Sequence, residues 1–430
     1  MKVAFYTLGC KVNQYETDVM MKKFSDNDFD IVDFEDVSDI YVVNSCSVTN
    51  LSTRKTRQVL SKAKKNGGIV VLCGCYAQEI KDKYTSLANV DIIIGNEEKE
   101  QIVDIVNEYR KNGNNSDVIV KVSDIGEVKR YSGKELLQKG INVRESVKIE
   151  DGCNNFCSYC IIPYVRGRVR SRSIDDIILE IENLVKSGVG EVVLVGIEIA
   201  SYGKDLENNI NLVDVIERVN SINGLKRIRQ GTNQPRILTL DNIKRMAKCD
   251  KLCPHFHISV QSLDNSVLKR MNRKYTREDI FEITDNLRKY FKDAAFTCDI
   301  IVGFPGETDE EFRNTIEGVK RVSFYEVHAF KYSKRKWTRA ANMENQVDGN
   351  VAIARSKELI ELANDLKNKY MSAYIGKKMN VLFELYEEGY LYGYTNNYIK
   401  VKVEGDKKLW AVQQEVELCS IEGDLILGNI

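Results

Sequence analysis

Short apolar runs alternate with amphipathic stretches through the first 112 residues of the chain. An apolar run of four to eight residues favours a buried strand, and a longer stretch with apolar residues three or four apart favours a helix. Strands that alternate with helices predict a doubly wound parallel sheet, so residues 1–112 are expected to form an α/β domain. The predicted strands are Val3–Leu8, Ile40–Val43, Ile69–Leu72 and Asp91–Ile94, with helices at 15–24, 51–65, from about 77, and at 98–109.

The same alternation continues through a second domain, expected at residues 139–369. Six βα units rather than eight predict a partial barrel that is open along one side. The six predicted strands are Ser146–Glu150, Glu191–Gly196, Arg227–Arg229, Phe256–Val260, Ala295–Val302 and Glu326–Phe330.

The pattern changes at the C-terminus, where short strands of period two are divided by Gly and Asn turns. Residues 372–430 are therefore expected to form a small antiparallel β-barrel. Tyr392, Tyr394 and Tyr398 could stack on nucleic-acid bases. A tyrosine stripe at period two also fits ordinary barrel core or surface, and both interpretations stay open.

Composition narrows the class of protein. Lys plus Arg and Asp plus Glu both number 63, so the whole chain has no strongly basic surface. Residues 139–371 carry 38 basic and 33 acidic residues, and a polyanion would therefore be expected to touch the centre. The opening segment is too quickly polar for a signal peptide, and no apolar run could span a membrane, so a cytoplasmic protein is expected. Eleven cysteines then indicate reduced thiols and metal rather than disulfides.

Three of these cysteines, Cys153, Cys157 and Cys160, have the spacing C-x3-C-x2-C after a predicted strand. Thiolates hold cubane iron-sulfur clusters, and three thiolates on a four-iron cube leave one iron open to another ligand. A structural zinc site is the alternative. Zinc sites usually close with a fourth ligand at short spacing, and none follows before Cys249.

A second trio follows from the predicted parallel sheet. Cys10, Cys46 and Cys75 each come directly after a predicted strand. Because the carboxyl ends of parallel strands lie at one edge, these thiols should converge and could hold a second cluster. The alternative is that they are small buried packing residues. Cys73 is expected to point into the core, and four more cysteines are expected to be packing residues: Cys249, Cys253, Cys298 and Cys419.

Several motifs resemble one family along essentially the whole chain, the radical S-adenosylmethionine methylthiotransferases. The similarity is sharpest to the branch that acts on N6-threonylcarbamoyladenosine in tRNA. The motifs are GCKVNQYET at 9–17, NSCSVT at 44–49, GCYAQ at 74–78, DGCNNFCSYCIIPYVRGRVRSR at 151–172, LKRMNRKYT at 268–276 and DIIVGFPGET at 299–308.

The resemblance implies an enzyme that adds a methylthio group to C2 of N6-threonylcarbamoyladenosine at tRNA position 37. It implies two [4Fe-4S] clusters and S-adenosylmethionine as cofactors. The Cys153, Cys157 and Cys160 cluster would cleave the cofactor to a 5′-deoxyadenosyl radical. The Cys10, Cys46 and Cys75 cluster would hold the sulfur that is methylated. The six cysteines are thus the expected catalytic and metal-binding residues.

The resemblance also implies partners and further site residues. The tRNA anticodon stem-loop would be the substrate, a flavodoxin or ferredoxin the electron donor, and residues 372–430 a TRAM-like RNA-binding barrel; a monomer without a membrane partner is expected. Candidate S-adenosylmethionine contacts, each of which could instead be structural, are Tyr159, Gly196, Glu198, Gln261, Asp299 and Val302. Four residues depart from the family pattern. Glu198 stands where the family usually has His or Asn, Gln234 where it has Glu, and both Leu263 and Trp337 where it has Gly.

Each of two basic segments can be interpreted in two ways. Alternating arginines could line one side of an extended segment and meet phosphates, or could form salt bridges within the barrel. They are Arg166, Arg168, Arg170 and Arg172. A second run could bind phosphates or be a solvated loop, and comprises Lys331, Lys334, Arg335, Lys336 and Arg339.

Alternative functions also remain at this point. They are methylthiolation of isopentenyladenosine in tRNA or of a ribosomal protein, and an iron-sulfur RNA-binding protein without turnover. The GCKVNQYET run speaks against the first two, and the departures from the family pattern keep the third open.

Overall fold

The computed structural model describes residues 1–83, 87, 89–111, 117–133, 142–207 and 210–430. Two compact units are present, each made of several segments. The first comprises Met1–Leu137, Lys148–Arg172 and Ser333–Ala341, and the second Gln138–Val147, Ser173–Tyr332 and Asn342–Ile430. The domain boundaries expected at 112 and 139 lie outside the described residues, so the division into three domains stays a prediction. Across the described ranges, no helix has both the length and the apolar content needed to cross a membrane.

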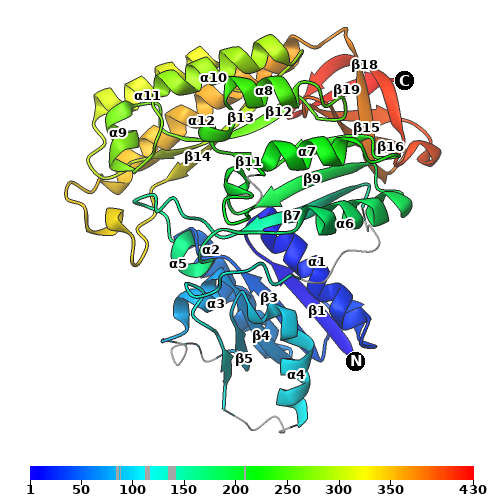
Figure 1. Cartoon of the computed structure of the whole chain (residues 1–430), viewed down its shortest axis with the longest axis vertical. Coiled ribbons are helices and arrows are strands. Elements are labelled where there is room, and N and C mark those ends of the chain that lie inside the picture. Colours follow the sequence, from blue (N-terminus) through cyan, green and yellow to red (C-terminus); the bar gives the residue numbers. More distant parts are fainter. Residues whose placement is uncertain (84–86, 88, 112–116, 134–141, 208–209) are drawn as a thin grey trace. The chain divides into compact units, whose positions relative to one another are not determined.

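The first unit contains a six-stranded, fully parallel sheet in the order β2-β1-β3-β4-β5-β6. Helices α1 and α4 pack on one face, and α2 and α3 pack on the other. Both faces are covered, which confirms the doubly wound sheet (Figure 1). The elements are β1 (Lys2–Thr7), α1 (Lys11–Ser25), β2 (Asp30–Val32), β3 (Ile40–Ser45), α2 (Asn50–Lys65), β4 (Ile69–Gly74), α3 (Cys75–Ile80), β5 (Ile92–Ile94), α4 (Ile102–Lys111) and β6 (Ile119–Lys121).

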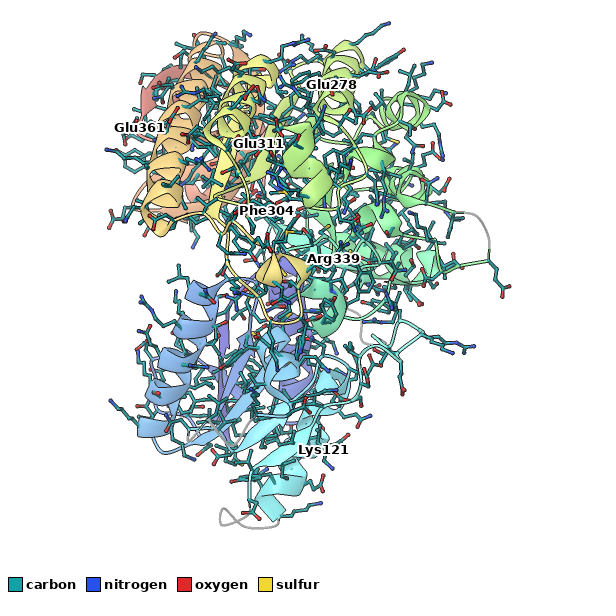
Figure 2. The ribbon with its side chains drawn as sticks, turned by 90° about the vertical axis from the view of Figure 1, so that its left-hand side faces the viewer. Lys121, Glu278, Phe304, Glu311, Arg339 and Glu361 are labelled. Carbon is teal, nitrogen blue, oxygen red and sulfur yellow. The ribbon has the colours of Figure 1, made fainter. Side chains whose placement is uncertain are left out.

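The two edge strands of this sheet, β2 and β6, were not anticipated. Each has three residues, which is too short for an apolar pattern to identify. Lys121 is exposed on β6 (Figure 2). Its ammonium lies 3.8 Å from the Glu108 carboxylate. A short edge strand that carries a lysine resists pairing with other chains.

All six strands predicted for the partial barrel are present. They are β7 (Arg144–Asp151), β9 (Glu191–Gly196), β10 (Arg227–Gln230), β12 (His255–Gln261), β13 (Ala295–Val302) and β14 (Glu326–Lys331). The strand orders are β10-β9-β7-β8 and β11-β12-β13-β14, with the two-residue strands β8 (Arg170–Ser171) and β11 (Thr232–Asn233) completing the sheets. Strand β7 begins in the second unit and ends in the first.

Helices follow the strands of the partial barrel. Figure 1 shows α10, α11 and α12 along the same side of strands β12 to β14. The helices are α5 (Ile162–Val165), α6 (Ile174–Lys186), α7 (Leu212–Asn220), α8 (Leu240–Met246), α9 (Asn265–Arg270), α10 (Arg277–Tyr290), α11 (Asp309–Val322) and α12 (Gly349–Ser372).

A closed five-stranded barrel ends the chain. Its strands are β15 (Lys378–Glu387), β16 (Tyr390–Thr395), β17 (Lys400–Glu404), β18 (Gln413–Glu422) and β19 (Leu425–Asn429), in the order β15-β16-β17-β19-β18. The pairing is antiparallel except between β17 and β19, which are parallel, so the expectation of a purely antiparallel barrel was wrong for this pair. Its core also includes Ala295, Tyr325 and Met371, so the barrel packs on the rest of the second unit.

Two arginines of β10 bind the C-terminal barrel through its backbone. Arg227 donates to the carbonyls of Tyr394 (2.7 Å) and Asn380 (2.8 Å). Arg229 donates to the carbonyls of Thr395 (2.8 Å) and Asn396 (2.9 Å). These side chains are buried, so the barrel is held in place by charge-assisted hydrogen bonds.

Two tyrosines of the C-terminal barrel, Tyr394 and Tyr398, also pack at its interface with the rest of the second unit. The Tyr398 ring stacks on the His255 ring (4.3 Å between centroids) and on the Tyr394 ring (4.8 Å). The guanidinium of Arg144 lies 5.0 Å from the Tyr394 ring centroid. Two rings stack on Tyr398, so base stacking was the wrong interpretation for this residue, and for Tyr394, which is partly exposed, it stays open. Tyr392 is partly exposed, and its role stays open.

The carboxylate of Glu191 neutralises the arginines beneath the barrel, and its removal should be costly. Burial disfavours the charged carboxylate, but Arg229, Arg144 and Arg227 outweigh burial and hold the pKa of Glu191 below its usual 4.5. Glu191→Gln removes the carboxylate paired with the buried Arg227 and Arg229, while Arg144 keeps its ion pair with Glu384, and should lower the free energy of unfolding by about 3–5 kcal/mol. Urea unfolding followed by Trp410 fluorescence, in a Trp337→Phe background, measures this loss.

The stability lost in Glu191→Gln should depend on pH. Because the folded-state pKa of Glu191 is lowered, its stabilisation is present above its ordinary pKa and disappears as the pH falls through the folded value. The difference between the wild type and Glu191→Gln should therefore shrink from pH 7 to pH 3. Glu217→Gln, which removes an exposed partner of Arg245, is the control and should cost no more than about 1 kcal/mol. A Glu191→Gln cost that does not change with pH contradicts this prediction.

Candidate functional site

Three strand-to-helix turns place Cys10, Cys46 and Cys75 at the carboxyl edge of the parallel sheet. Cys10 caps α1, Cys46 follows β3, and Cys75 is the first residue of α3. Both Gly9 and Gly74 have positive φ, +111° and +91°, which permits a sharp turn before the cysteine. A Cβ atom on Gly9 would lie 3.2 Å from the Cys46 sulfur, so the first turn packs directly on the second cysteine. The cysteines begin helices α1 and α3, which start earlier than predicted.

The thiols of this trio oppose one another's ionisation. Burial and the neighbouring Cys75 raise the pKa of Cys46 to about 11. A metal cluster supplies the positive charge that lets clustered thiols ionise together, so this donor set fits an iron-sulfur cluster. The packing alternative does not explain why Cys10 is exposed and Cys46 partly exposed, although Cys75 is buried beside Ile161 and Val165. Cys73 is fully buried in the core, as predicted.

The loop that carries Cys153, Cys157 and Cys160 is ordered by its own backbone. The Cys153 N–H donates to the Gly167 carbonyl (3.0 Å), and the Cys160 N–H donates to the Cys157 carbonyl (3.0 Å). The Asn155 side-chain amide donates to the Cys153 sulfur at 3.3 Å, and its backbone N–H lies 3.5 Å from the same sulfur. Donors aimed at sulfur stabilise a thiolate, so this loop also fits a thiolate-bound cluster.

Close packing surrounds the same loop. Gly152 has φ +85°, and a Cβ atom there would lie 1.9 Å from the Arg168 carbonyl oxygen. Only glycine fits at this position. The exposed Arg168 guanidinium covers the Phe156 ring at 4.6 Å from its centroid, and the Ala340 N–H donates to the Ser158 carbonyl (2.7 Å).

The first unit also contains a buried charge cluster, which we define as Glu16, Lys99, Lys148, Asp151 and Arg166. Lys148 Nζ lies 2.7 Å from both Glu16 Oε1 and Asp151 Oδ2. Arg166 donates to Glu16 Oε2 (3.0 Å) and to Asp151 Oδ2 (3.2 Å), and Lys99 pairs with Glu16. Three cations of the cluster therefore share its two carboxylates, and a fourth, Arg170, lies 3.7 Å from Asp151.

Arg166 connects this charge cluster to a candidate ligand. Its Nε donates to the Cys75 sulfur at 3.2 Å. Burial lowers the pKa of a guanidinium, but Cys75, Glu16 and Asp151 outweigh it and hold the pKa of Arg166 well above its usual range. The surplus positive charge of the cluster thus faces a sulfur that would be anionic when bound to metal.

The alternating arginines do not line an open surface. Arg166, Arg170 and Arg172 are buried, so the phosphate interpretation was wrong for these three residues, and Arg168 alone is exposed. Salt bridging is confirmed for Arg166 and for Arg170, whose guanidinium lies 3.7 Å from Asp151.

In the second basic run, Arg335 is buried and donates to Asn50 Oδ1 at 2.7 Å. The other members are exposed, as a solvated loop would be: Lys331, Lys334, Lys336 and Arg339.

The predicted cofactor contacts lie mainly where the strands end. Gly196, Gln261 and Val302 are the last residues of β9, β12 and β13. Asp299 was expected at a strand end and instead lies inside β13, beside His257. Val302 shares the fully buried face of β13 with Ile300, so it could offer a ligand only its backbone. Tyr159, between two candidate ligands, belongs to the first unit, and all of these binding roles stay predictions.

Two of the four residues that depart from the family pattern, Glu198 and Leu263, have local partners. Glu198 is buried and forms an ion pair of 3.0 Å with Arg236. Leu263 is fully buried against Gly318, where an added Cβ would lie 2.7 Å from the Leu263 Cβ. Trp337 has φ +67°, a conformation that favours glycine. Gln234 precedes the short helix Pro235–Ile237, and within the described ranges its side chain has no hydrogen bond or ion pair.

Sequence reasoning missed several residues of the site. The charge cluster joins positions up to 150 residues apart, and no local spacing reveals such pairs. His257 and His328 were also missed, although the chain has only three histidines and all lie in strands. Cys249, Cys253 and Cys298 are buried, as expected for packing residues, but Cys419 is exposed, so that interpretation was wrong.

Comparison with known proteins agrees with this geometry. Residues 147–319 match the Radical SAM superfamily, and residues 2–95 match Uncharacterized protein family UPF0004. A solved radical S-adenosylmethionine methyltransferase, TsrM from Kitasatospora setae, shares the fold, with a TM-score of 0.57 over 79% of this chain and 77% of that chain at 13% identity. The fold and the cysteine loop thus define a radical S-adenosylmethionine protein.

Curated relatives identify the family within this class. One is the threonylcarbamoyladenosine tRNA methylthiotransferase MtaB of Bacillus subtilis (strain 168), 39% identical over 95% of this chain and 91% of the relative. The protein of the same name in Aquifex aeolicus (strain VF5) is 34% identical over 95% of this chain and 98% of the relative. The tRNA-2-methylthio-N(6)-dimethylallyladenosine synthase of Clostridium tetani (strain Massachusetts / E88) is 37% identical over 88% of this chain and 84% of the relative. The chain belongs to the radical S-adenosylmethionine methylthiotransferase family.

Proposed function

We propose that this protein is a tRNA methylthiotransferase that adds a methylthio group to C2 of N6-threonylcarbamoyladenosine at position 37. The observation that carries the proposal is the pair of cysteine trios in one compact unit, with Arg166 in contact with Cys75. The relatives from Bacillus subtilis and Aquifex aeolicus, each aligned over 95% of this chain, are both named for threonylcarbamoyladenosine.

Each trio would hold one [4Fe-4S] cluster. Cys153, Cys157 and Cys160 would hold the first cluster, with S-adenosylmethionine on its open iron, and the second would be bound by Cys10, Cys46 and Cys75. When bound, these groups supply the electron and radical chemistry that sulfur insertion at a carbon–hydrogen bond requires. The proposed contacts to S-adenosylmethionine are Tyr159, Gly196, Glu198, Gln261, Asp299 and Val302.

The chain's own groups prepare both sites for thiolate ligands. Asn155 donates two N–H groups towards the Cys153 sulfur, and Arg166 donates one to Cys75. Hydrogen bonds to sulfur and nearby charge are among the factors that set the reduction potential of an iron-sulfur cluster. Asn155 and Arg166 are therefore positioned to adjust the two clusters separately.

The proposed partners follow from the substrate. The anticodon stem-loop of tRNA would be bound, with residues 372–430 acting as a TRAM-like RNA-binding barrel, and a flavodoxin or ferredoxin would supply electrons. We further propose that the enzyme acts as a monomer in the cytoplasm, where its tRNA substrate is found.

A second candidate substrate is isopentenyladenosine in tRNA, because the relative from Clostridium tetani is named for dimethylallyladenosine and is 37% identical. One assay separates the two. Cluster-loaded protein, reductant and S-adenosylmethionine are incubated with tRNA that carries either nucleoside, and the digested nucleosides are analysed by mass spectrometry. The proposal expects a methylthio product from threonylcarbamoyladenosine alone. A product from isopentenyladenosine, or no product from either, contradicts it.

A further inference from the structure

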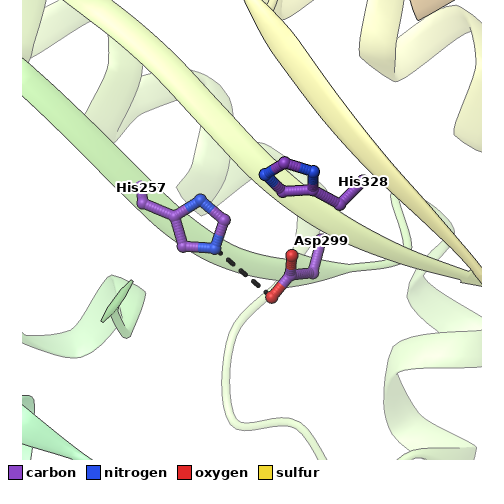
Figure 3. Close-up of side chains that lie close together, drawn as sticks. All are labelled: His257, Asp299 and His328. Atoms are coloured by element: carbon purple, nitrogen blue, oxygen red, sulfur yellow. Dashed lines mark ion pairs between the residues drawn. The ribbon is translucent and has the colours of Figure 1, made fainter. Parts of the chain in front are cut away.

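Three side chains on adjacent strands of the second unit converge outside the cysteine sites: His257, Asp299 and His328. Their ligand atoms all lie within 4.8 Å of one another. His257 Nε2 lies 3.3 Å from Asp299 Oδ2, the pair that is joined by the dashed line in Figure 3. The two imidazole rings are 5.7 Å apart between centroids and inclined by 43°, so they are not stacked and both can direct a nitrogen towards the carboxylate.

Strand register brings these residues together. Asp299 on β13 pairs directly with His328 on β14, and His257 on β12 pairs with Thr297, two residues before Asp299 on the same face. Alternate residues such as Phe256 and Cys298 point to the opposite face and are fully buried. The trio therefore lies on the face of the sheet that helices do not cover.

The neighbouring groups orient the first histidine as a ligand. His257 Nδ1 lies 2.8 Å from Thr297 Oγ1. In the tautomer whose Nδ1–H donates to this hydroxyl, the lone pair of Nε2 faces the Asp299 carboxylate, and a bound cation would bridge these two acceptors. In the other tautomer, Nε2–H donates to Asp299 directly. Metal-binding histidines usually donate their second nitrogen to such a partner, which fixes the tautomer and the ring orientation.

We propose that His257, Asp299 and His328 bind a divalent transition-metal ion such as Zn²⁺. Two imidazole nitrogens and one carboxylate oxygen are a donor set that suits zinc or ferrous iron, whereas Mg²⁺ and Ca²⁺ prefer oxygen alone. Three protein ligands leave at least one coordination position open. Because His328 is exposed and Asp299 is partly exposed, an outside ligand can reach that position. Asp299 would then serve this metal rather than S-adenosylmethionine.

The open position suggests a role in substrate choice, and this step rests on the proposed function. The threonylcarbamoyl group carries a free carboxylate, whereas adenosine and isopentenyladenosine do not. A carboxylate oxygen is a good ligand for a divalent metal ion. The metal would thus bind the threonine carboxylate and favour the threonylcarbamoyl nucleoside over its unmodified form.

Metal binding is tested on the full-length, cluster-loaded protein. Isothermal titration with Zn²⁺ should show one site per chain, and X-ray absorption at the zinc edge should show nitrogen and oxygen neighbours. His328→Gln and Asp299→Asn should each weaken Zn²⁺ binding about tenfold or more, with iron and sulfide content unchanged. Glu326→Gln is the matched control, because Glu326 lies two residues from His328 on the same face of β14 and pairs with Lys367; it should bind Zn²⁺ like the wild type.

Three results would overturn the metal site. They are no Zn²⁺ binding to the wild type, binding that survives in His328→Gln and Asp299→Asn, and sulfur neighbours around the zinc. Sulfur neighbours would mean that cysteines bind the ion. Absence of binding would leave His257 and Asp299 as a plain ion pair.

The substrate step has a separate readout. The Zn²⁺-loaded wild type should bind tRNA with threonylcarbamoyladenosine more tightly than the same tRNA with unmodified adenosine, and His328→Gln should lose this preference. Equal affinity for the two tRNAs would overturn the carboxylate step while leaving the metal site intact. Failure of the methylthiolation assay with this preference retained would instead count against the proposed function.

Discussion

Replacing Cys153 by alanine should abolish reductive cleavage of S-adenosylmethionine in protein that still folds. The remaining thiols of the loop, Cys157 and Cys160, provide two ligands, and a cube with an open iron needs three. Release of 5′-deoxyadenosine, measured by chromatography after anaerobic incubation with dithionite, should fall to background. Methylthiolation should fall with it.

Two further variants make this prediction specific. Cys46→Ala removes a ligand of the other trio, so it should leave cofactor cleavage intact and stop methylthiolation. Cys419→Ala makes the same chemical change at an exposed cysteine outside both trios and should leave both activities unchanged. Robust cleavage by Cys153→Ala would disprove the assignment of the loop cysteines.

Replacing Arg166 by methionine should destabilise the first unit by about 3–5 kcal/mol. Arg166 is completely buried and is bonded to Glu16, Asp151, Asn13 and Cys75. Its removal leaves buried acceptors without a donor and two carboxylates with less counter-charge, which is the costly way to break a buried ion pair. Urea unfolding followed by Trp337 fluorescence, in a Trp410→Phe background, measures the change.

Conservative and control variants locate the effect of Arg166. Arg166→Lys keeps the charge but cannot reproduce the planar set of donors, so an intermediate loss is expected. Arg168→Met removes an exposed arginine two residues away and should cost less than about 1 kcal/mol. If Arg166→Met and Arg168→Met have the same free energy of unfolding, the buried charge cluster does not stabilise the first unit as predicted.

Arg166 should also affect the second cluster without changing its ligands. In a Cys153→Ala background, where only the Cys10, Cys46 and Cys75 cluster is expected, the reduction potential can be followed by electron paramagnetic resonance. Loss of the N–H donor and the positive charge beside Cys75 should make the potential more negative in Arg166→Met. An unchanged potential would limit Arg166 to a structural role.

Much of the fold could be predicted because its signals are local. Apolar runs such as Ile69–Leu72 identify buried strands, and parallel topology sends the residues after them to one edge, which is how Cys10, Cys46 and Cys75 could be grouped. The spacing of Cys153, Cys157 and Cys160 within one loop carries its own chemical meaning. Strands β2 and β6 were missed because three residues cannot display a pattern.

Long-range pairing could not be predicted in the same way. Glu16 and Arg166 are separated by 150 positions, and nothing in either segment identifies the other. The alternation of Arg166 and Arg170 fitted phosphate contacts and salt bridges equally well, and the structure shows that both side chains pair with buried carboxylates. His257, Asp299 and His328 converge only in one strand register, which the apolar pattern does not determine to the single residue.

Iron and acid-labile sulfide in anaerobically purified protein provide the decisive comparison, made on the wild type and on Cys46→Ala. Two four-iron cubes predict about eight iron and eight sulfide per wild-type chain, and about four of each in Cys46→Ala, whose remaining cube is held by Cys153, Cys157 and Cys160. About four iron in the wild type, or the same content in both proteins, would contradict a second cluster at Cys10, Cys46 and Cys75.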